Sequence, residues 1–207
     1  MSYKINLHAH TIFSDGANTP YTMALKAKEL GFTALVITDH YYGPEYPEFM
    51  CESSMRLLKK ACREAKKILP VIVGMEVVFM GEEVLVFGGG AINDILATGK
   101  PSMDKMVQLK KDHNCAVILC HPGEDFELTV PVIDGYERIN RGMDMFGSGR
   151  RGLGGLTDKV SWCNSDAHMA DSLEICYNIV DTKIVNESDL IRYIKKGKQP
   201  EFFIEGQ

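Results

Sequence analysis

Short apolar runs, each followed by a histidine or a carboxylate, constrain the fold of this chain most strongly. Three of them are almost continuously apolar, as is typical of strands buried on both faces: 32–38, 71–76 and 116–120. A helical pattern precedes each of these runs, at 20–30, 53–69 and 102–113. Alternating strands and helices with short connections predict an α/β fold with a largely parallel sheet.

The remaining segments are assigned less directly. The opening run through His10 and the segments 132–139, 160–164 and 201–205 are predicted strands, and 188–196 is a predicted helix. We expect loops at 41–49 and at 141–157, which is rich in Gly and Arg. Residues 77–87 are ambiguous, with a candidate hairpin turn at Gly81-Glu82 and a break at the three glycines that follow.

The first apolar run ends in His8-Ala9-His10, five residues before Asp15. Side chains alternate faces along an extended strand, so two imidazoles two residues apart point the same way and can reach one metal ion. Asp15, in a Ser-Asp-Gly turn, is placed to bring a carboxylate toward the same ion. Taken alone, the pair could equally be ordinary polar residues at a strand end.

The whole set of candidate ligands favours a barrel over an open sheet. These residues lie at, or just past, the carboxyl ends of predicted strands: His8, His10, His40, Glu76, His121, Asp166 and His168. In a barrel all such ends meet on one face, whereas an open sheet gathers ligands at one switch point. Imidazole and carboxylate ligands without a thiolate suit Zn, Mn or Fe, and their number suggests two or three ions with Glu76 bridging.

Several motifs resemble those of the PHP (polymerase and histidinol phosphatase) superfamily and follow its order along the chain: His8-Ala9-His10, Ser14-Asp15-Gly16, Thr38-Asp39-His40, Gly74-Met75-Glu76, His121-Pro122 and Ser165-Asp166-Ala167-His168. The resemblance implies a distorted (β/α)7 barrel over a single domain, 1–207. It also implies a two- or three-metal phosphoesterase site formed by His8, His10, Asp15, His40, Glu76, His121, Asp166 and His168.

The expected reaction is hydrolysis of a small phosphate ester, most simply a phosphomonoester, by metal-bound water. Asp15, His40 and His168 are the candidate acid or base assistants. Basic residues near the last motif, Arg138, Arg141, Arg150 and Arg151, are candidates for holding the phosphate, although a solvated loop is the more common explanation for any single one of them.

The sequence departs from the family pattern at one ligand. Many members carry a further histidine in a His-x-Leu-Gly pattern, where this chain has Leu85-Val86-Phe87-Gly88. We therefore expect two tightly bound ions and a third that binds weakly. Glu82 or Glu83 could substitute for the imidazole, but strand alternation allows only one of them to face the site.

Composition and charge limit the kinds of partner and the cellular compartment that we expect. A net charge of −5 disfavours a general grip on nucleic acid, so we expect a small phosphorylated substrate and no general nucleic-acid binding. No apolar run is long enough for a membrane span or signal peptide. The six cysteines form no C-x-x-C pair and are expected to be buried thiols in a reducing, cytoplasmic environment. The oligomeric state stays open.

Two other functions are compatible with a metal site on this fold class. An amidohydrolase would typically use a carboxylated lysine at a strand end, but no predicted strand here ends in Lys. A catalytically weak metal-binding or regulatory module would keep the ligands and lose the reaction. Turnover of a phosphoester separates both alternatives from the phosphoesterase.

Overall fold

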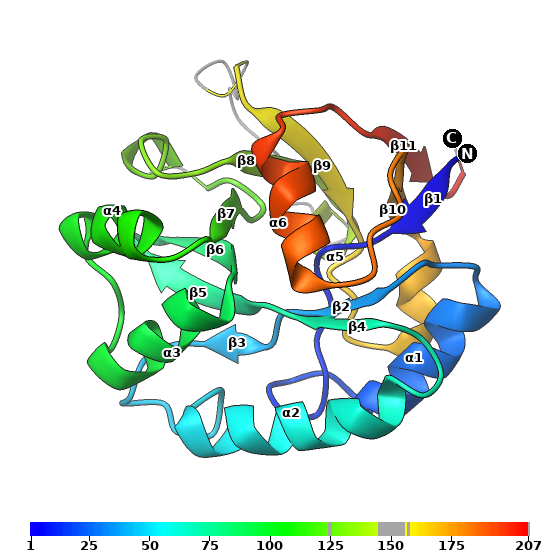
Figure 1. Ribbon diagram of the computed structural model, residues 1–207, viewed down its shortest axis with the longest axis horizontal. Helices are drawn as coiled ribbons and strands as arrows, with labels where there is room; N and C mark the ends of the chain where they lie inside the picture. Colours follow the sequence, from blue (N-terminus) through cyan, green and yellow to red (C-terminus); the bar gives the residue numbers. More distant parts are fainter. Residues whose placement is uncertain (124–125, 145–155, 157, 207) are drawn as a thin grey trace.

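The computed structural model describes residues 1–123, 126–144, 156 and 158–206. Its helices are α1 (Pro20–Glu29), α2 (Glu52–Ala65), α3 (Gly89–Thr98), α4 (Met103–Asp112), α5 (Arg141–Asp144) and α6 (Glu187–Lys195). Its strands are β1 (Tyr3–Ile5), β2 (Leu35–Ile37), β3 (His40–Tyr41), β4 (Val71–Val73), β5 (Met75–Phe79), β6 (Glu82–Phe87), β7 (Ala116–Leu119), β8 (Gly135–Asn140), β9 (Val160–Asn164), β10 (Cys176–Val180) and β11 (Glu201–Ile204). Figure 1 shows α1 to α4 around the outside of the strands and α6 across one end of them.

Helix α1 forms as its sequence predicts. The hydroxyl of Thr19 accepts a hydrogen bond from the backbone N–H of Thr22 at 3.2 Å, and Pro20 occupies the first helical position. Gly31 follows the helix with a φ of 78°, the left-handed conformation in which glycine ends helices at least cost. These local signals fix both ends of the helix before any packing is considered.

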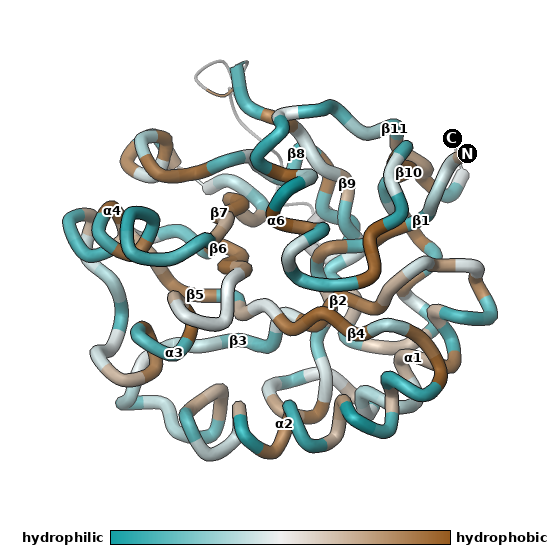
Figure 2. Tube along the Cα trace, in the orientation of Figure 1, coloured by the Kyte–Doolittle hydropathy of each residue, from teal (hydrophilic) through white to brown (hydrophobic). Residues whose placement is uncertain are grey.

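Helix α2 is amphipathic and begins at an unusual cap. Its buried stripe, Met55, Leu58, Cys62 and Ala65, matches the stripe expected from the sequence. Figure 2 shows the same alternation of hydrophobic and hydrophilic residues along the helix. The residue before the helix is Cys51, whose backbone N–H donates to the Ser54 hydroxyl at 2.6 Å.

Cys51 is expected to be the most reactive thiol of the protein. Hydrogen bonds from the hydroxyls of Ser53 and Ser54 lower the pKa of Cys51 to about 7, whereas burial raises the pKa of Cys62 to about 12. Because the thiolate is the nucleophile, alkylation by iodoacetamide should increase as pH rises through about 7 and then level off. Mass spectrometry of the labelled native protein measures this, and Ser53→Ala should move the midpoint upward. Faster labelling at any of the five buried cysteines would contradict it.

The strands pair in three sheets, with the orders β1-β10-β11, β2-β4 and β3-β5-β6-β7-β8-β9. The mixed α/β class is therefore confirmed. The closed (β/α)7 barrel is not: among the described residues no ladder joins the three sheets into one ring. The expectation of a largely parallel sheet is also wrong, because half of the pairings between these strands are antiparallel.

The antiparallel pairings come from two segments that the sequence did not resolve. Residues 77–87 form a hairpin of β5 and β6 that turns at Met80 and Gly81, both with positive φ. Strand β10, which was not predicted, runs antiparallel to both β1 and β11. Two other local predictions are corrected: α3 begins at Gly89, where a break was expected, and Tyr41 belongs to β3 and not to the predicted loop 41–49.

An apolar cluster binds the three sheets together. It takes Ile5 from β1, Ile72 from β4 and Trp162 from β9, all almost completely buried. Ile191 and Ile194 of α6 pack into the same cluster, so this helix covers the end of the strands away from the candidate ligands. The apolar cluster thus holds the strands together, and the candidate ligands are not part of it.

None of the helices in the described part of the chain has the length and apolar character that a membrane crossing requires.

Candidate metal centre

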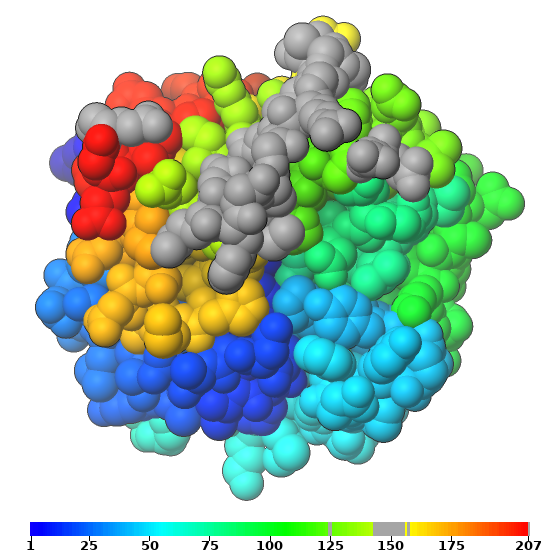
Figure 3. Space-filling view, turned by 180° about the vertical axis from the view of Figure 1, so that it is seen from behind, coloured from blue at the N-terminus to red at the C-terminus, as the bar shows by residue number. Residues whose placement is uncertain are grey.

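The opening motif lies against the last one. Strand β1 ends at Ile5, but Ala9 still pairs with Ala167 in a parallel bridge, and the His10 N–H donates to the Ala167 carbonyl at 2.9 Å. The Ala17 N–H donates to the His168 carbonyl at 2.7 Å. Figure 3 shows the N-terminal segment and the segment around residue 168 side by side on one face, next to residues 40–50. Three parts of the chain far apart in sequence therefore meet at this face.

Glu76, at the start of β5, is the centre of the cluster. Its side chain is 1% exposed, and four imidazoles surround its carboxylate. The distances from Glu76 Oε2 are 3.0 Å to His8 Nε2, 3.3 Å to His10 Nε2 and 2.9 Å to His40 Nδ1. His121 Nε2 lies 3.3 Å from the other oxygen, Oε1. Although burial opposes its ionisation, these imidazoles hold the pKa of Glu76 well below its usual range.

Asp166 provides a second carboxylate shared by several histidines. Its Oδ1 lies 3.0 Å from His10 Nε2, 3.4 Å from His8 Nε2 and 3.7 Å from His168 Nδ1. The backbone of Asp166 has a φ of 52°, a left-handed conformation that costs a non-glycine residue about 1–2 kcal/mol. Strain of this kind persists where the surroundings impose it, and it is common at functional sites.

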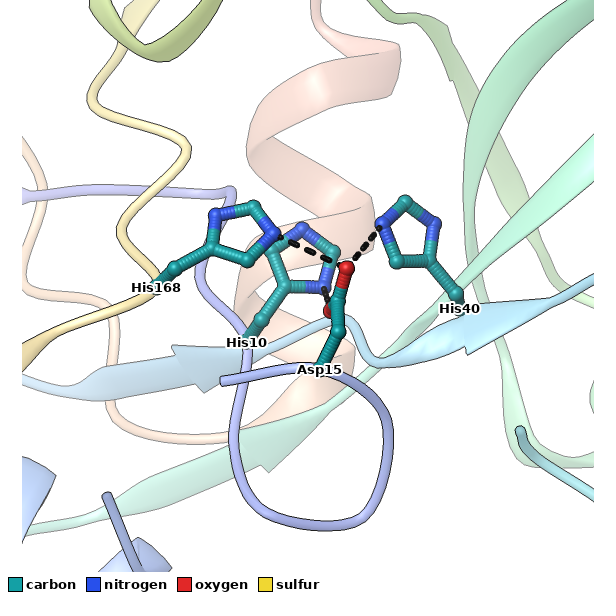
Figure 4. A group of neighbouring side chains, drawn as sticks. All are labelled: His10, Asp15, His40 and His168. Atoms are coloured by element: carbon teal, nitrogen blue, oxygen red, sulfur yellow. Dashed lines mark ion pairs between the residues drawn. The ribbon is translucent and has the colours of Figure 1, made fainter. Parts of the chain in front are cut away.

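Asp15 faces His10, His40 and His168, as Figure 4 shows. Its Oδ2 lies 3.3 Å from His168 Nε2 and 3.6 Å from His40 Nε2, and its Oδ1 lies 3.8 Å from His10 Nδ1. The side chains of Asp15 and His168 are 41% and 40% exposed, whereas those of His8 and His10 are fully buried. The hydrogen bond to Asp15 raises the pKa of His168 to about 9. Asp15 and His168 are therefore the most exposed of the eight candidate ligands.

The turn that carries Asp15 is held from below by Asp39. This buried carboxylate accepts hydrogen bonds from the Thr11 N–H at 2.6 Å and from the hydroxyls of Thr11 and Ser14, both at 2.8 Å. Gly16 closes the turn, because a Cβ at that position would lie 2.6 Å from the Thr11 nitrogen. The Asp of the Thr-Asp-His motif thus has a positioning role that the sequence did not reveal.

The residues present fit divalent cations. Several buried atoms of the cluster make no hydrogen bond, although nitrogen and oxygen approach closely: His8 Nε2, His10 Nε2, His40 Nδ1, both Glu76 oxygens and Asp166 Oδ1. Buried polar atoms without partners are costly, and a cation between them satisfies several at once. Subsets of the cluster place one ligand atom per residue within 4.8 Å of one another, including His8 with His10 and Glu76, and Asp15 with His10, His40 and His168.

A thiol also lies beside the cluster. Cys120 falls within the same distance limit of Glu76 and His121. Burial raises the pKa of the Cys120 thiol well above its ordinary value. Cys120 is a potential ligand that the set of imidazoles and carboxylates predicted from the sequence did not include.

Glu137 on β8 is a positioning residue that sequence reasoning missed. Its Oε1 lies 2.8 Å from His8 Nδ1, which turns the other ring nitrogen of His8 toward Glu76. Its Oε2 accepts from the His121 N–H at 3.0 Å and from Asn140 at 2.7 Å. Such a carboxylate behind a ligand histidine fixes the ring and its tautomer. The available signal was a carboxylate inside a predicted buried strand.

The arginines that were predicted to hold a phosphate have little support in the described residues. Arg138 is exposed, and Arg141, at the first position of α5, is half-buried with its Nε unpaired. Neither makes an ion pair within the described residues. Arg150 and Arg151 lie outside the described residues, as does most of the predicted loop 141–157; its first four residues form α5.

The PHP domain model matches residues 6–137 of this chain. In structure, the chain is similar to a two-domain protein from Bacteroides vulgatus that contains a predicted PHP-like metal-dependent phosphoesterase (TM-score 0.66, 16% identity, 99% of this chain and 65% of that one). It is also similar to PsfC from Pseudomonas syringae (0.66, 13%, 100% and 93%) and to the lesion-specific endonuclease Q of Pyrococcus furiosus (0.60, 14%, 98% and 58%). This chain thus spans less than two thirds of the first and third of these proteins. None of the curated proteins matches its sequence.

One of these comparisons corrects an expectation about partners. Endonuclease Q has been solved with a 27-mer duplex that carries an abasic lesion at the active site, and this chain shares its fold (TM-score 0.57, 16% identity). The fold therefore serves a DNA-cleaving enzyme. The exclusion of nucleic acid, which we based on the net charge of −5, was wrong, because overall charge does not describe the surface around one site.

Proposed function

Because this chain belongs to the PHP domain family, whose structural relatives include metal-dependent phosphoesterases, we propose that it hydrolyses a phosphomonoester of a small molecule with the help of bound divalent cations. The observation that carries the proposal is the convergence of His8, His10, His40 and His121 on the carboxylate of Glu76, with buried ligand atoms left unpaired.

Two or three ions of Zn, Mn or Fe are the proposed cofactors. The proposed ligands are the eight residues of the sequence motifs: His8, His10, Asp15, His40, Glu76, His121, Asp166 and His168. When bound, such ions activate water and neutralise negative charge on phosphoryl oxygens. Glu76 and Asp166 are the natural bridging residues, since each carboxylate faces at least three imidazoles.

Proton transfer is assigned to the open side of the cluster. Asp15 lies between His40 and His168, so its carboxylate orients both rings and can pass a proton through either. His168, the most exposed of the histidines in the cluster, keeps a proton at neutral pH when no cation binds it. A ring nitrogen of His40 or His168 that holds no cation is the proposed proton donor to a leaving alkoxide on this side.

The depth of the site supports a terminal phosphate. His8, His10 and Glu76 are buried, and the most exposed of the candidate ligands are Asp15 and His168. A phosphomonoester presents its phosphate at the end of the molecule and can extend it inward, whereas an internal diester carries a chain on both sides. Arg141, with an unpaired nitrogen beside β8, is a candidate contact for the substrate.

The alternative functions are less well supported. Amidohydrolases typically take their carboxylated lysine from a strand end, and no strand in the described part of the chain ends in Lys. A metal-binding module without activity would use the same ligands, so only an assay of turnover separates it from the enzyme.

A substrate panel tests the proposal. Chelator-treated protein is supplied with Mn, Zn, Fe or Mg and assayed on small phosphomonoesters, phosphodiesters and a duplex with an abasic site. We expect metal-dependent release of phosphate from at least one monoester. Cleavage of the duplex alone would replace the small substrate by nucleic acid, and metal binding without any turnover would establish the binding module.

A further inference from the structure

Leu85 and Glu83 lie on the same face of β6. In the β5–β6 ladder Leu85 is opposite Glu76, and side chains of directly opposed residues share a face. Glu83 is two residues away from Leu85, so alternation puts its side chain on that face as well. Leu85 is completely buried in the apolar cluster beneath the site. At the position where the family has a histidine, this chain thus has the buried side chain of Leu85. The neighbouring position on the same face carries the carboxylate of Glu83.

The side chain of Glu83 reaches the candidate metal centre. Its Oε2 lies 3.4 Å from His121 Nε2, and its Oε1 lies 3.7 Å from His40 Nδ1. His40, Glu76 and Glu83 each offer a ligand atom, all within 4.8 Å of one another. Two of these partners bring buried unpaired atoms, His40 Nδ1 and both oxygens of Glu76. Glu83 therefore adds a carboxylate to a group in which His40 and Glu76 have buried atoms without hydrogen-bond partners.

The side chain of the neighbouring Glu82 points away from the candidate metal centre. Although it precedes Glu83 directly, it points to the other side of the strand and accepts a hydrogen bond from the Gly123 N–H at 2.7 Å. Two adjacent glutamates thus have separate tasks, one holding the turn after His121 and one facing the imidazoles. Sequence alone left open which of them turned inward.

We propose that Glu83 is the ligand that replaces the missing histidine, for a cation held with Glu76, His40 and His121. The inference rests on the proposed function. It names Glu83 as the substitute for the histidine that the family pattern has and this chain lacks. A carboxylate in place of an imidazole makes this position richer in oxygen, which favours Mn²⁺ or Mg²⁺ over Zn²⁺ there. It also revises the expectation of two retained ions to three.

The test measures metal rather than activity. Wild-type protein is loaded with Mn²⁺ or Zn²⁺ and dialysed, and its metal content is determined by elemental analysis beside Glu83→Gln and Glu82→Gln. We expect Glu83→Gln to lose about one ion per chain, or to bind its weakest Mn²⁺ at least about tenfold less tightly, as for other losses in a metal's surroundings. Glu82→Gln keeps the wild-type content, because a Gln carbonyl can still accept from Gly123.

A third variant, Glu83→His, separates ligation from packing. It restores a nitrogen ligand at the rim, so the ion should be retained with its preference moved from Mn²⁺ toward Zn²⁺. Equal metal content in wild type, Glu83→Gln and Glu82→Gln overturns the proposal. So does equal loss in both glutamine variants, since that would reflect the hairpin and not the ligand. These outcomes do not depend on whether any phosphoester is hydrolysed, so failure of the proposed function is recognised separately.

Discussion

Glu76→Gln is expected to abolish most metal binding and to reduce hydrolysis by more than about 100-fold. Loss of a group that only supports a ligand already costs about 10–100-fold, and Glu76 is in the proposed ligand set itself. Glutamine keeps the size of the side chain but removes the charge that faces His8, His10, His40 and His121. It also leaves two or more cations without the carboxylate that offsets them.

Metal content by elemental analysis and turnover of the best substrate should fall together in Glu76→Gln. Circular dichroism establishes that the variant is folded, and Glu82→Gln on the adjoining strand is the matched control. Full activity with full metal content would remove Glu76 from the centre of the site.

Glu137→Gln is expected to weaken metal binding by about 10–100-fold without changing any proposed ligand. Glu137 holds His8 through Nδ1 and holds the backbone of His121, and it also accepts from Asn140 and Asn164. An amide has one oxygen for these donors, and its NH₂ group cannot accept a hydrogen bond. The rings are then less well oriented, and the tautomer of His8 is no longer fixed.

Isothermal titration of the chelator-treated variant with Mn²⁺ measures this loss directly. The control is Asp134→Asn, which removes a carboxylate from the same part of the chain. Asp134 pairs with Lys110 at 2.6 Å and accepts from the Val117 N–H, and none of its described ion pairs involves a histidine of the cluster. Asp134→Asn should lower thermal stability and leave the metal affinity unchanged. If both variants bind metal like the wild type, Glu137 does not position His8.

Local signals in the sequence accounted for much of the fold. The Thr19 cap, the glycine at 31 and the apolar stripe of α2 depend on neighbours within one or two turns, so they are readable without the rest of the chain. The candidate ligands were readable for a similar reason. All of them except Asp15 lie where an apolar run ends, and polar residues at such positions must face something other than the core.

Which side chains meet was decided by the tertiary structure. The contact between Glu137 and His8 joins residues 129 apart in sequence, and the face taken by Glu83 depends on the register of β5 against β6. A shift of one residue in that register would have turned Glu82 inward instead, and apolar patterning in 77–87 was too weak to exclude it. The division into three sheets likewise follows from long-range pairing, because β10 (Cys176–Val180) pairs with β1 (Tyr3–Ile5) near the other end of the chain. Local sequence sets the ends of elements, but contacts between distant residues carry no local pattern, and they determine the site.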